Sequence, residues 1–100
     1  MKPQHRTRAI LKSGLEASQK IILVAISDHM EDTEEGPDRN ARPSVDLLCA
    51  ETGLSERTLQ GHIQTLIKAG ILSRHQIPGH RTPHYLIDWG ALPPQILRPR

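Results

Sequence analysis

The sequence predicts a small, mainly helical domain in which three helices are followed by a β-hairpin. Its 100 residues are enough for one domain and too few for two. The apolar residues are almost all aliphatic, with one Trp, one Tyr and no Phe. Capping residues mark the ends of three helical segments, and apolar alternation follows only after the last of them. A β-sandwich would need a regular series of short strands, which this sequence lacks.

The composition argues against secreted and membrane proteins. The single Cys49 has no partner for an internal disulfide. The longest apolar run, Ile21 to Ile26, is far shorter than the roughly 18 residues of a membrane span. The basic N-terminus has no apolar signal-peptide core behind it. We therefore expect a cytoplasmic, nucleoid-associated protein without membrane contacts.

Charge is distributed unevenly along the chain, although the net charge is only +2. Residues 1–27 carry five Lys or Arg against one acidic residue. Residues 28–38 carry six acidic residues and no Lys or Arg, and residues 39–100 carry eight basic against four acidic. Two basic regions thus flank an acidic one, so the local positive field exceeds what the total suggests.

The N-terminal third predicts an arm, one helix and a loop. Residues 1–12 are expected to form a basic, flexible arm. Ser13 and Glu16 have the spacing of a capping box, which places a helix over residues 13–30. This helix is apolar on all sides at its centre, so we expect burial on several sides. Residues 31–43 are acidic and contain Gly and Pro, which predicts a solvated loop.

Two closely spaced helices follow. Ser44 is a good N-cap for a helix over residues 44–52, and Gly53 is suited to end it in the left-handed conformation. Ser55 caps the next helix, over residues 55–69, with Leu54 before it able to pack against the first turn. Two capped helices joined by a three-residue turn with Gly are typical of the helix-turn-helix motif.

The C-terminal part predicts a hairpin and a tail. Apolar runs flank a Pro-Gly turn within residues 71–89, and Tyr85, Ile87 and Trp89 alternate on one face. A hairpin directly after the second helix of such a motif is a wing, so the sequence predicts a winged helix-turn-helix. Residues 90–100 are rich in Pro and basic, and we expect a tail with little to fold around.

The helix over 55–69 would place its N-terminal and outward side chains in the DNA major groove. Arg pairs with guanine, Gln with adenine, and Thr contacts the thymine methyl group, whereas a Gly lets the backbone approach a phosphate. The predicted DNA-binding residues are Ser55, Glu56, Arg57, Thr58, Gln60, Gly61, Gln64 and Lys68 of this helix and Arg74, His80 and Arg81 of the wing. For an isolated helix, a solvated polar face would be the simpler explanation. The adjoining motif and wing favour DNA binding.

The segments 20–29 and 43–72 resemble the winged helix-turn-helix domains of phage and plasmid replication proteins. Those domains in turn are similar to the DNA-binding halves of GntR-type repressors. The most specific similarity lies in Thr52-Gly-Leu-Ser-Glu-Arg-Thr58 and Ala69-Gly-Ile-Leu72. The resemblance implies that Ser55, Arg57 and Thr58 contact DNA. Positions 60 and 61, often basic in such domains, are Gln and Gly in this chain.

The sequence does not predict an enzyme, a cofactor, a metal site or a small-molecule ligand. His75, His80 and His84 lack the Cys or carboxylate neighbours that usually complete a zinc site, so contact with DNA or water is the better explanation. Cys49 lies on an apolar helix face and is expected to pack in the core. The acidic cluster over 28–38 lacks the spacing of a calcium loop.

We expect sequence-specific binding of double-stranded DNA, either as a bacterial or phage transcriptional regulator or as a replication-origin binder. The alternative is a winged-helix adaptor that binds proteins and not DNA. A homodimer is a further hypothesis, because one such helix covers only a few base pairs. The basic residues of the arm would follow phosphates without selecting bases, unless they serve only solubility.

Overall fold

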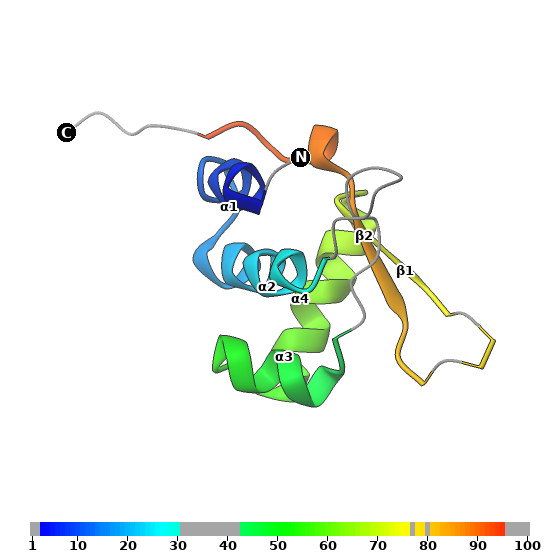
Figure 1. Ribbon diagram of the computed structural model, residues 1–100. Coiled ribbons are helices and arrows are strands. Elements are labelled where there is room, and N and C mark those ends of the chain that lie inside the picture. The colour runs from blue at the N-terminus through cyan, green and yellow to red at the C-terminus, as the bar shows by residue number, and fades with distance from the viewer. Residues whose placement is uncertain (1–2, 31–42, 77, 80, 96–100) are drawn as a thin grey trace.

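The computed structural model describes residues 3–30, 43–76, 78–79 and 81–95 (Figure 1). Their elements are α1 (Pro3–Leu11), α2 (Ala17–Asp28), α3 (Val45–Thr52), α4 (Glu56–Lys68), β1 (Leu72–His75), β2 (His84–Ile87) and the 3-10 turn η1 (Trp89–Ala91). The predicted class is confirmed, since the domain is mainly helical and a two-stranded hairpin follows the helices. The predicted acidic loop lies outside the described residues, except for its last residue.

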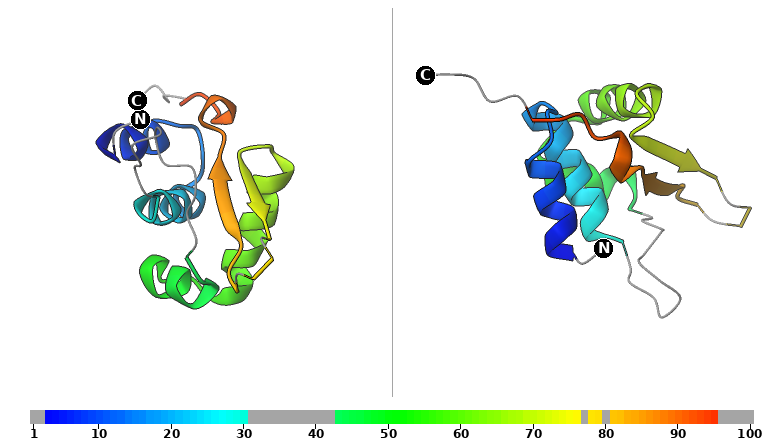
Figure 2. Two further views of the ribbon diagram at one scale, coloured as in Figure 1. Left: turned by 45° about the vertical axis from the view of Figure 1, so that its right-hand side comes forward. Right: turned by 90° about the horizontal axis from the view of Figure 1, so that it is seen from above.

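The prediction of an irregular N-terminal arm is wrong, because Pro3–Leu11 forms α1. This helix packs against α2, and the two run side by side in both views of Figure 2. Ile10 is fully buried in the common core, and the side chain of Arg6 is buried as well. A single anchoring apolar residue among basic ones gives no periodic signal, so the helix was not evident from the sequence.

The predicted capping box does not form. The helix α2 begins at Ala17, and the side chain of its N-cap Glu16 makes no capping hydrogen bond. The Ser13 hydroxyl instead donates to the Ile10 carbonyl at 2.6 Å, which completes the end of α1. The residues of the expected box therefore belong to the connection between two helices.

Helix α2 lies at the centre of the helical part, with α1 on one side and α3 and α4 on the other (Figures 1 and 2). Its Ile22, Leu23 and Ile26 are fully buried. The expected burial is thus confirmed for these central residues. It does not extend around the whole helix, since Val24 and Ala25 are half-buried and 45% of the surface of Ile21 is exposed.

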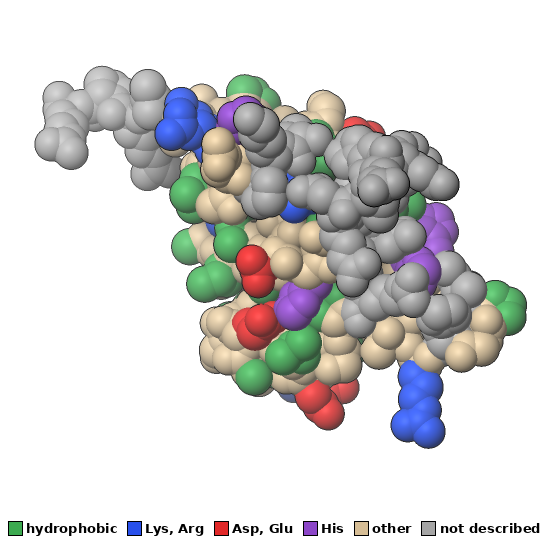
Figure 3. Space-filling view, in the orientation of Figure 1, with side chains coloured by type: hydrophobic (Ala, Val, Ile, Leu, Met, Phe, Trp, Pro, Cys, Tyr) green, Lys and Arg blue, Asp and Glu red, His purple; other side chains and the backbone are tan. Residues whose placement is uncertain are grey.

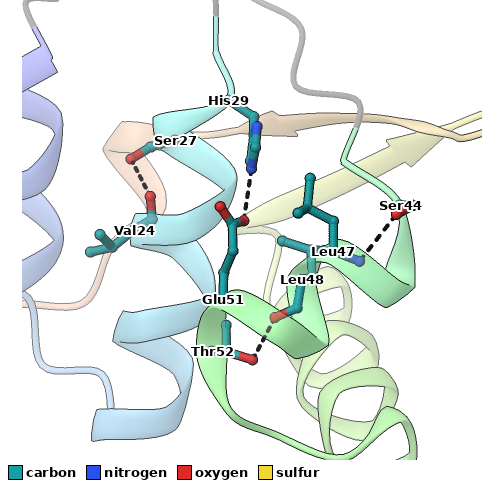
Figure 4. Close-up of polar contacts among 8 residues, drawn as sticks. All are labelled: Val24, Ser27, His29, Ser44, Leu47, Leu48, Glu51 and Thr52. Carbon is teal, nitrogen blue, oxygen red and sulfur yellow. Dashed lines mark hydrogen bonds and ion pairs between the residues drawn. The ribbon is translucent and has the colours of Figure 1, made fainter.

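The ends of α3 agree with the sequence prediction. The Ser44 hydroxyl accepts a hydrogen bond from the Leu47 N–H at 3.1 Å, which caps the N-terminus (Figure 4). Gly53 ends the helix with φ +75°, and its N–H donates to the Cys49 carbonyl. Only Gly adopts this left-handed conformation at little cost, so the sharp turn into α4 depends on it.

The ends of α4 also agree with prediction. The Ser55 hydroxyl accepts from the Thr58 N–H at 3.2 Å. At the other end, Gly70 has φ +77°, and the N–H of the following Ile71 donates to the Leu66 carbonyl. This i→i−5 bond is a Schellman closure, in which Gly commonly takes the left-handed position. Each boundary is set by residues within one or two turns of it.

The two strands form the predicted antiparallel hairpin, with Leu72 opposite Ile87 at one end and His75 opposite His84 at the other. Tyr85 and Ile87 are buried, as the alternation indicated. His84 is also buried, with only 5% of its surface exposed. The expectation that His84 contacts DNA or water is therefore wrong.

The C-terminal segment does not behave as a tail up to Gln95. Trp89 and Leu92 pack against the core, and η1 begins at Trp89 and ends just before Leu92. The Pro93 carbonyl accepts a hydrogen bond from the Gly14 N–H at 2.8 Å, and Pro94 bridges to Ser13. The chain after the hairpin thus returns to the junction of α1 and α2, where it covers the core.

Candidate nucleic-acid interface

Helix α4 has one buried and one exposed face. The buried face carries Leu59, Ile63 and Leu66. The opposite face is exposed and carries Arg57, Gly61, Gln64 and Lys68, spaced by three or four residues. Side chains at this spacing form a continuous stripe along a helix. Four of the predicted DNA-binding residues therefore share one surface, which we call the α4 stripe.

The N-terminus of α4 is accessible at one end of this stripe. Ser55, Glu56 and Thr58 are all exposed. The Ser55 hydroxyl accepts from the Thr58 N–H and donates to the Thr58 hydroxyl at 3.0 Å, so its observed role is to cap the helix. The positive end of the helix dipole, with free N–H groups, lies beside this cap and suits a phosphate.

Gly61 lies in the middle of the stripe and has no structural role within the domain. Its backbone is ordinary helix, and a Cβ built there would meet no atom within 4 Å. Gly in an exposed helix interior costs about 1 kcal/mol relative to Ala. Nothing inside the described structure compensates for that cost. Without a side chain at this position, another molecule has room to approach the helix backbone.

Two residues of α4 differ from what the predicted set of DNA-binding residues implies. Gln60 is half-buried at the edge of the exposed face, so it is less available than Gln64. Thr65 is exposed on the same face as Gly61, four residues later, and its hydroxyl donates to the Gly61 carbonyl at 3.1 Å. Thr65 was not among the DNA-binding residues predicted from the sequence, although its helical spacing from Gly61 places it on the same face.

The hairpin that follows α4 carries exposed cationic side chains. Arg74 of β1 is exposed and lies opposite Tyr85 of β2, while Arg81 is exposed between the strands. Figure 3 shows a cationic side chain that projects freely from the surface near the hairpin. His80, the third predicted wing residue, lies outside the described residues.

The N-terminal cations lie elsewhere. Arg8 and Lys12 are exposed on and just after α1, whereas Arg6 is buried. Helix α2 lies between α1 and α4 when the domain is seen from above (Figure 2). The described basic residues near the N-terminus are therefore separated from the α4 stripe by a whole helix.

Other kinds of site find little support in the part of the chain that the structure describes. No three His, Cys, Asp or Glu residues come together there in a group suited to a metal ion. Within the same residues, no helix has the length and apolar character needed to cross a membrane. The half-buried Cys49 packs against the core, as expected.

The comparisons with known proteins agree with this architecture. Residues 13–72, which contain α2, α3 and α4, match the model of a family described as helix-turn-helix domain. A solved structure of BpsR from Bordetella bronchiseptica, titled for the regulation of its DNA binding by 6-hydroxynicotinic acid, superposes with a TM-score of 0.55. It is 18% identical, and the match covers 85% of this chain and 60% of that one, so the similarity concerns the fold. No curated protein matches the chain.

Proposed function

Because the chain belongs to this family of helix-turn-helix domains, a DNA-binding class, we propose that it binds double-stranded DNA sequence-specifically with α4 in the major groove. The observation that carries the proposal is the α4 stripe. It is exposed, rich in hydrogen-bonding side chains, and interrupted by a Gly that the domain itself does not need. In this function the protein regulates transcription or marks a replication origin.

The stripe supports different roles along its length. Arg57 lies in the first turn of α4, where its guanidinium group reaches the major-groove edge of a guanine. Gln64 lies two turns later, with an amide suited to adenine. Lys68, in the last turn, is at the far end from the base-contacting N-terminus and is suited to a phosphate. The N-terminal half of α4 therefore selects bases, and the C-terminal half holds the backbone.

The hairpin supports the same docking. Arg74 and Arg81 are exposed on the strand and loop that follow α4, and His80 lies between them in sequence. Contacts from a wing to the neighbouring phosphates position a recognition helix without adding sequence preference by themselves. We assign this positioning role to the three wing residues.

The proposal is tested first by selection of bound duplexes from a random pool, then by two variants. Arg57→Ala should weaken binding to the selected site by roughly 1–3 kcal/mol and relax preference at one or two base pairs. Lys68→Ala should weaken cognate and scrambled duplexes about equally and reduce the log–log salt slope by about 0.9. Competition binding over a salt series measures both effects.

Three results decide between the alternatives. No retention of any duplex at low salt would contradict the proposal and favour a protein-binding adaptor. A change of base preference in Lys68→Ala, without one in Arg57→Ala, would show that α4 docks in another orientation. The position of the selected sequence in the source genome, at a promoter or at a replication origin, separates the two biological roles.

We also propose that the DNA-bound form is a homodimer. One recognition helix contacts only a few base pairs, and specific sites usually contain two half-sites about one helical turn apart. A dimer requires a surface that leaves α4 and the hairpin uncovered.

A further inference from the structure

Large apolar side chains are exposed on only one part of the described structure. They are Leu11 at the end of α1, Ile21 of α2 and Leu47 of α3, which are 54%, 45% and 41% exposed. No large hydrophobic residue of α4 or of the described hairpin residues is exposed to this degree. The three residues come from successive helices, and none of these helices carries the α4 stripe.

An open groove of about 260 Å³ connects these helices. Ile21, Val24 and Ala25 of α2 line its floor, and Thr7 of α1 and Glu51 of α3 line its walls. Apolar side chains gather on the α1–α2 side of the space-filling view, next to acidic ones (Figure 3). The floor of the groove is thus apolar over most of its length.

The two exposed leucines extend the walls of the groove. Leu11 follows Thr7 by one helical turn on α1, and Leu47 precedes Glu51 by one turn on α3. Figure 4 shows the side chains of Leu47 and Glu51 rising together from α3 toward the end of α2. We define the α1–α3 face as this groove together with Leu11 and Leu47.

Charged residues of both signs lie in or near the α1–α3 face. Asp28 lines the groove, and so does Glu51, whose carboxylate lies 2.7 Å from the His29 ring. Arg8 and Lys12 are exposed on and next to α1, one residue after Thr7 and Leu11 respectively. The groove therefore has an anionic part on α2 and α3, and α1 beside it carries exposed cations.

We propose that the α1–α3 face binds a second copy of this chain about a two-fold axis, with α1 of each copy lying over the groove of the other. In a two-fold interface the same surface occurs on both subunits, so its two parts must complement each other. Here the exposed cations of α1 in one copy meet the anionic groove of its partner, and the exposed leucines and Ile21 are buried between the two copies.

This arrangement adds an interface to the proposed function. It rests on that function only for the role of the dimer in DNA binding. The α1–α3 face shares no residue with the α4 stripe or the wing. Both recognition helices therefore stay accessible in the dimer. One dimer would then present two helices to two half-sites.

The first test is sedimentation of the full chain without DNA over a wide concentration range. The wild type should associate to a dimer. Leu11→Ser combined with Ile21→Ser should weaken association by about 100-fold, because the symmetric interface loses four apolar side chains. Both positions are exposed in the monomer, so thermal melting should show a folded domain. Leu47→Ser is a second, independent variant with the same expected direction.

A charge swap tests the two-fold arrangement. Arg8→Glu and Asp28→Lys should each weaken association, and the two changes in one chain should restore it, since each contact then has both charges reversed. A monomeric wild type at every concentration would overturn the proposal and leave the groove to another macromolecule. Equal association of the wild type and the Leu11→Ser, Ile21→Ser variant would overturn it too, as would a double charge variant weaker than either single one.

The control variant is Arg57→Ala, which alters the α4 stripe alone. It should dimerise like the wild type while losing base preference. The Leu11→Ser, Ile21→Ser variant should keep binding to a single half-site. Dimerisation without any DNA binding would leave the interface intact and refute only the proposed function. DNA binding by a monomer that never associates would refute only the interface.

Discussion

Replacing Gly61 by Ala should change stability and DNA affinity in opposite directions. The added methyl group meets no atom within 4 Å in the free domain, and the backbone at this position is ordinary helix. Ala is favoured over Gly in a helix interior by about 0.5–1 kcal/mol. For a domain of this size, that gain corresponds to a rise in melting temperature of roughly 2–8 °C.

The same methyl group should weaken DNA binding, because it stands on the surface that is proposed to enter the groove. If the helix backbone approaches a phosphate or a base edge at Gly61, the methyl group forces the two surfaces apart. We expect a loss of about 1–2 kcal/mol, or roughly 5- to 30-fold in affinity. Gly61→Leu should extend the series, with a folded, stable domain and a still larger loss of affinity.

The assay pairs thermal melting with fluorescence anisotropy on the selected duplex. A gain in stability together with a loss of affinity would assign the effect to the DNA interface. A variant with a damaged fold would lose both stability and affinity. A stabilised Gly61→Ala variant with wild-type affinity would refute the assignment of Gly61 to the interface. A Gly61→Ala variant that is less stable than the wild type would instead contradict the observation that a Cβ at this position meets no other atom within 4 Å.

Three further changes test the fold that positions the site. Gly14→Ala should lower the free energy of unfolding by roughly 1–3 kcal/mol, since its Cβ would lie 2.3 Å from the Pro94 carbonyl oxygen; an unchanged melting temperature would contradict the packing of the C-terminal segment. Ser55→Ala should cost about 1 kcal/mol in chemical denaturation by removing the cap of α4, and a neutral result would contradict its capping role. Removing the chain up to Leu11 should cost at least about 2 kcal/mol, because Ile10 leaves the core; a flexible arm would be removable without loss.

The helix-turn-helix itself follows from the sequence. Ser44, Gly53, Ser55 and Gly70 each fix a helix end through hydrogen bonds to residues at most a few positions away. Such signals are complete within a short window, so the boundaries of α3 and α4 were predictable. The α4 stripe was predictable for the same reason, since helical spacing alone separates its residues from the buried Leu59 side. Thr65, four residues after Gly61, follows the same rule.

The remainder was decided by contacts between segments that are distant in the sequence. Ser13 and Glu16 match a capping box locally, yet the buried Ile10 turns the preceding residues into a helix, and Ser13 closes it. The segment after the hairpin has no local structural signal, but its Pro93 carbonyl accepts a hydrogen bond from the Gly14 N–H. The free energy of such contacts depends on which surfaces meet in three dimensions. The secondary-structure propensity of a short segment contains no information about which distant segment it will contact. Only the tertiary structure could therefore place α1, the C-terminal segment and the α1–α3 face.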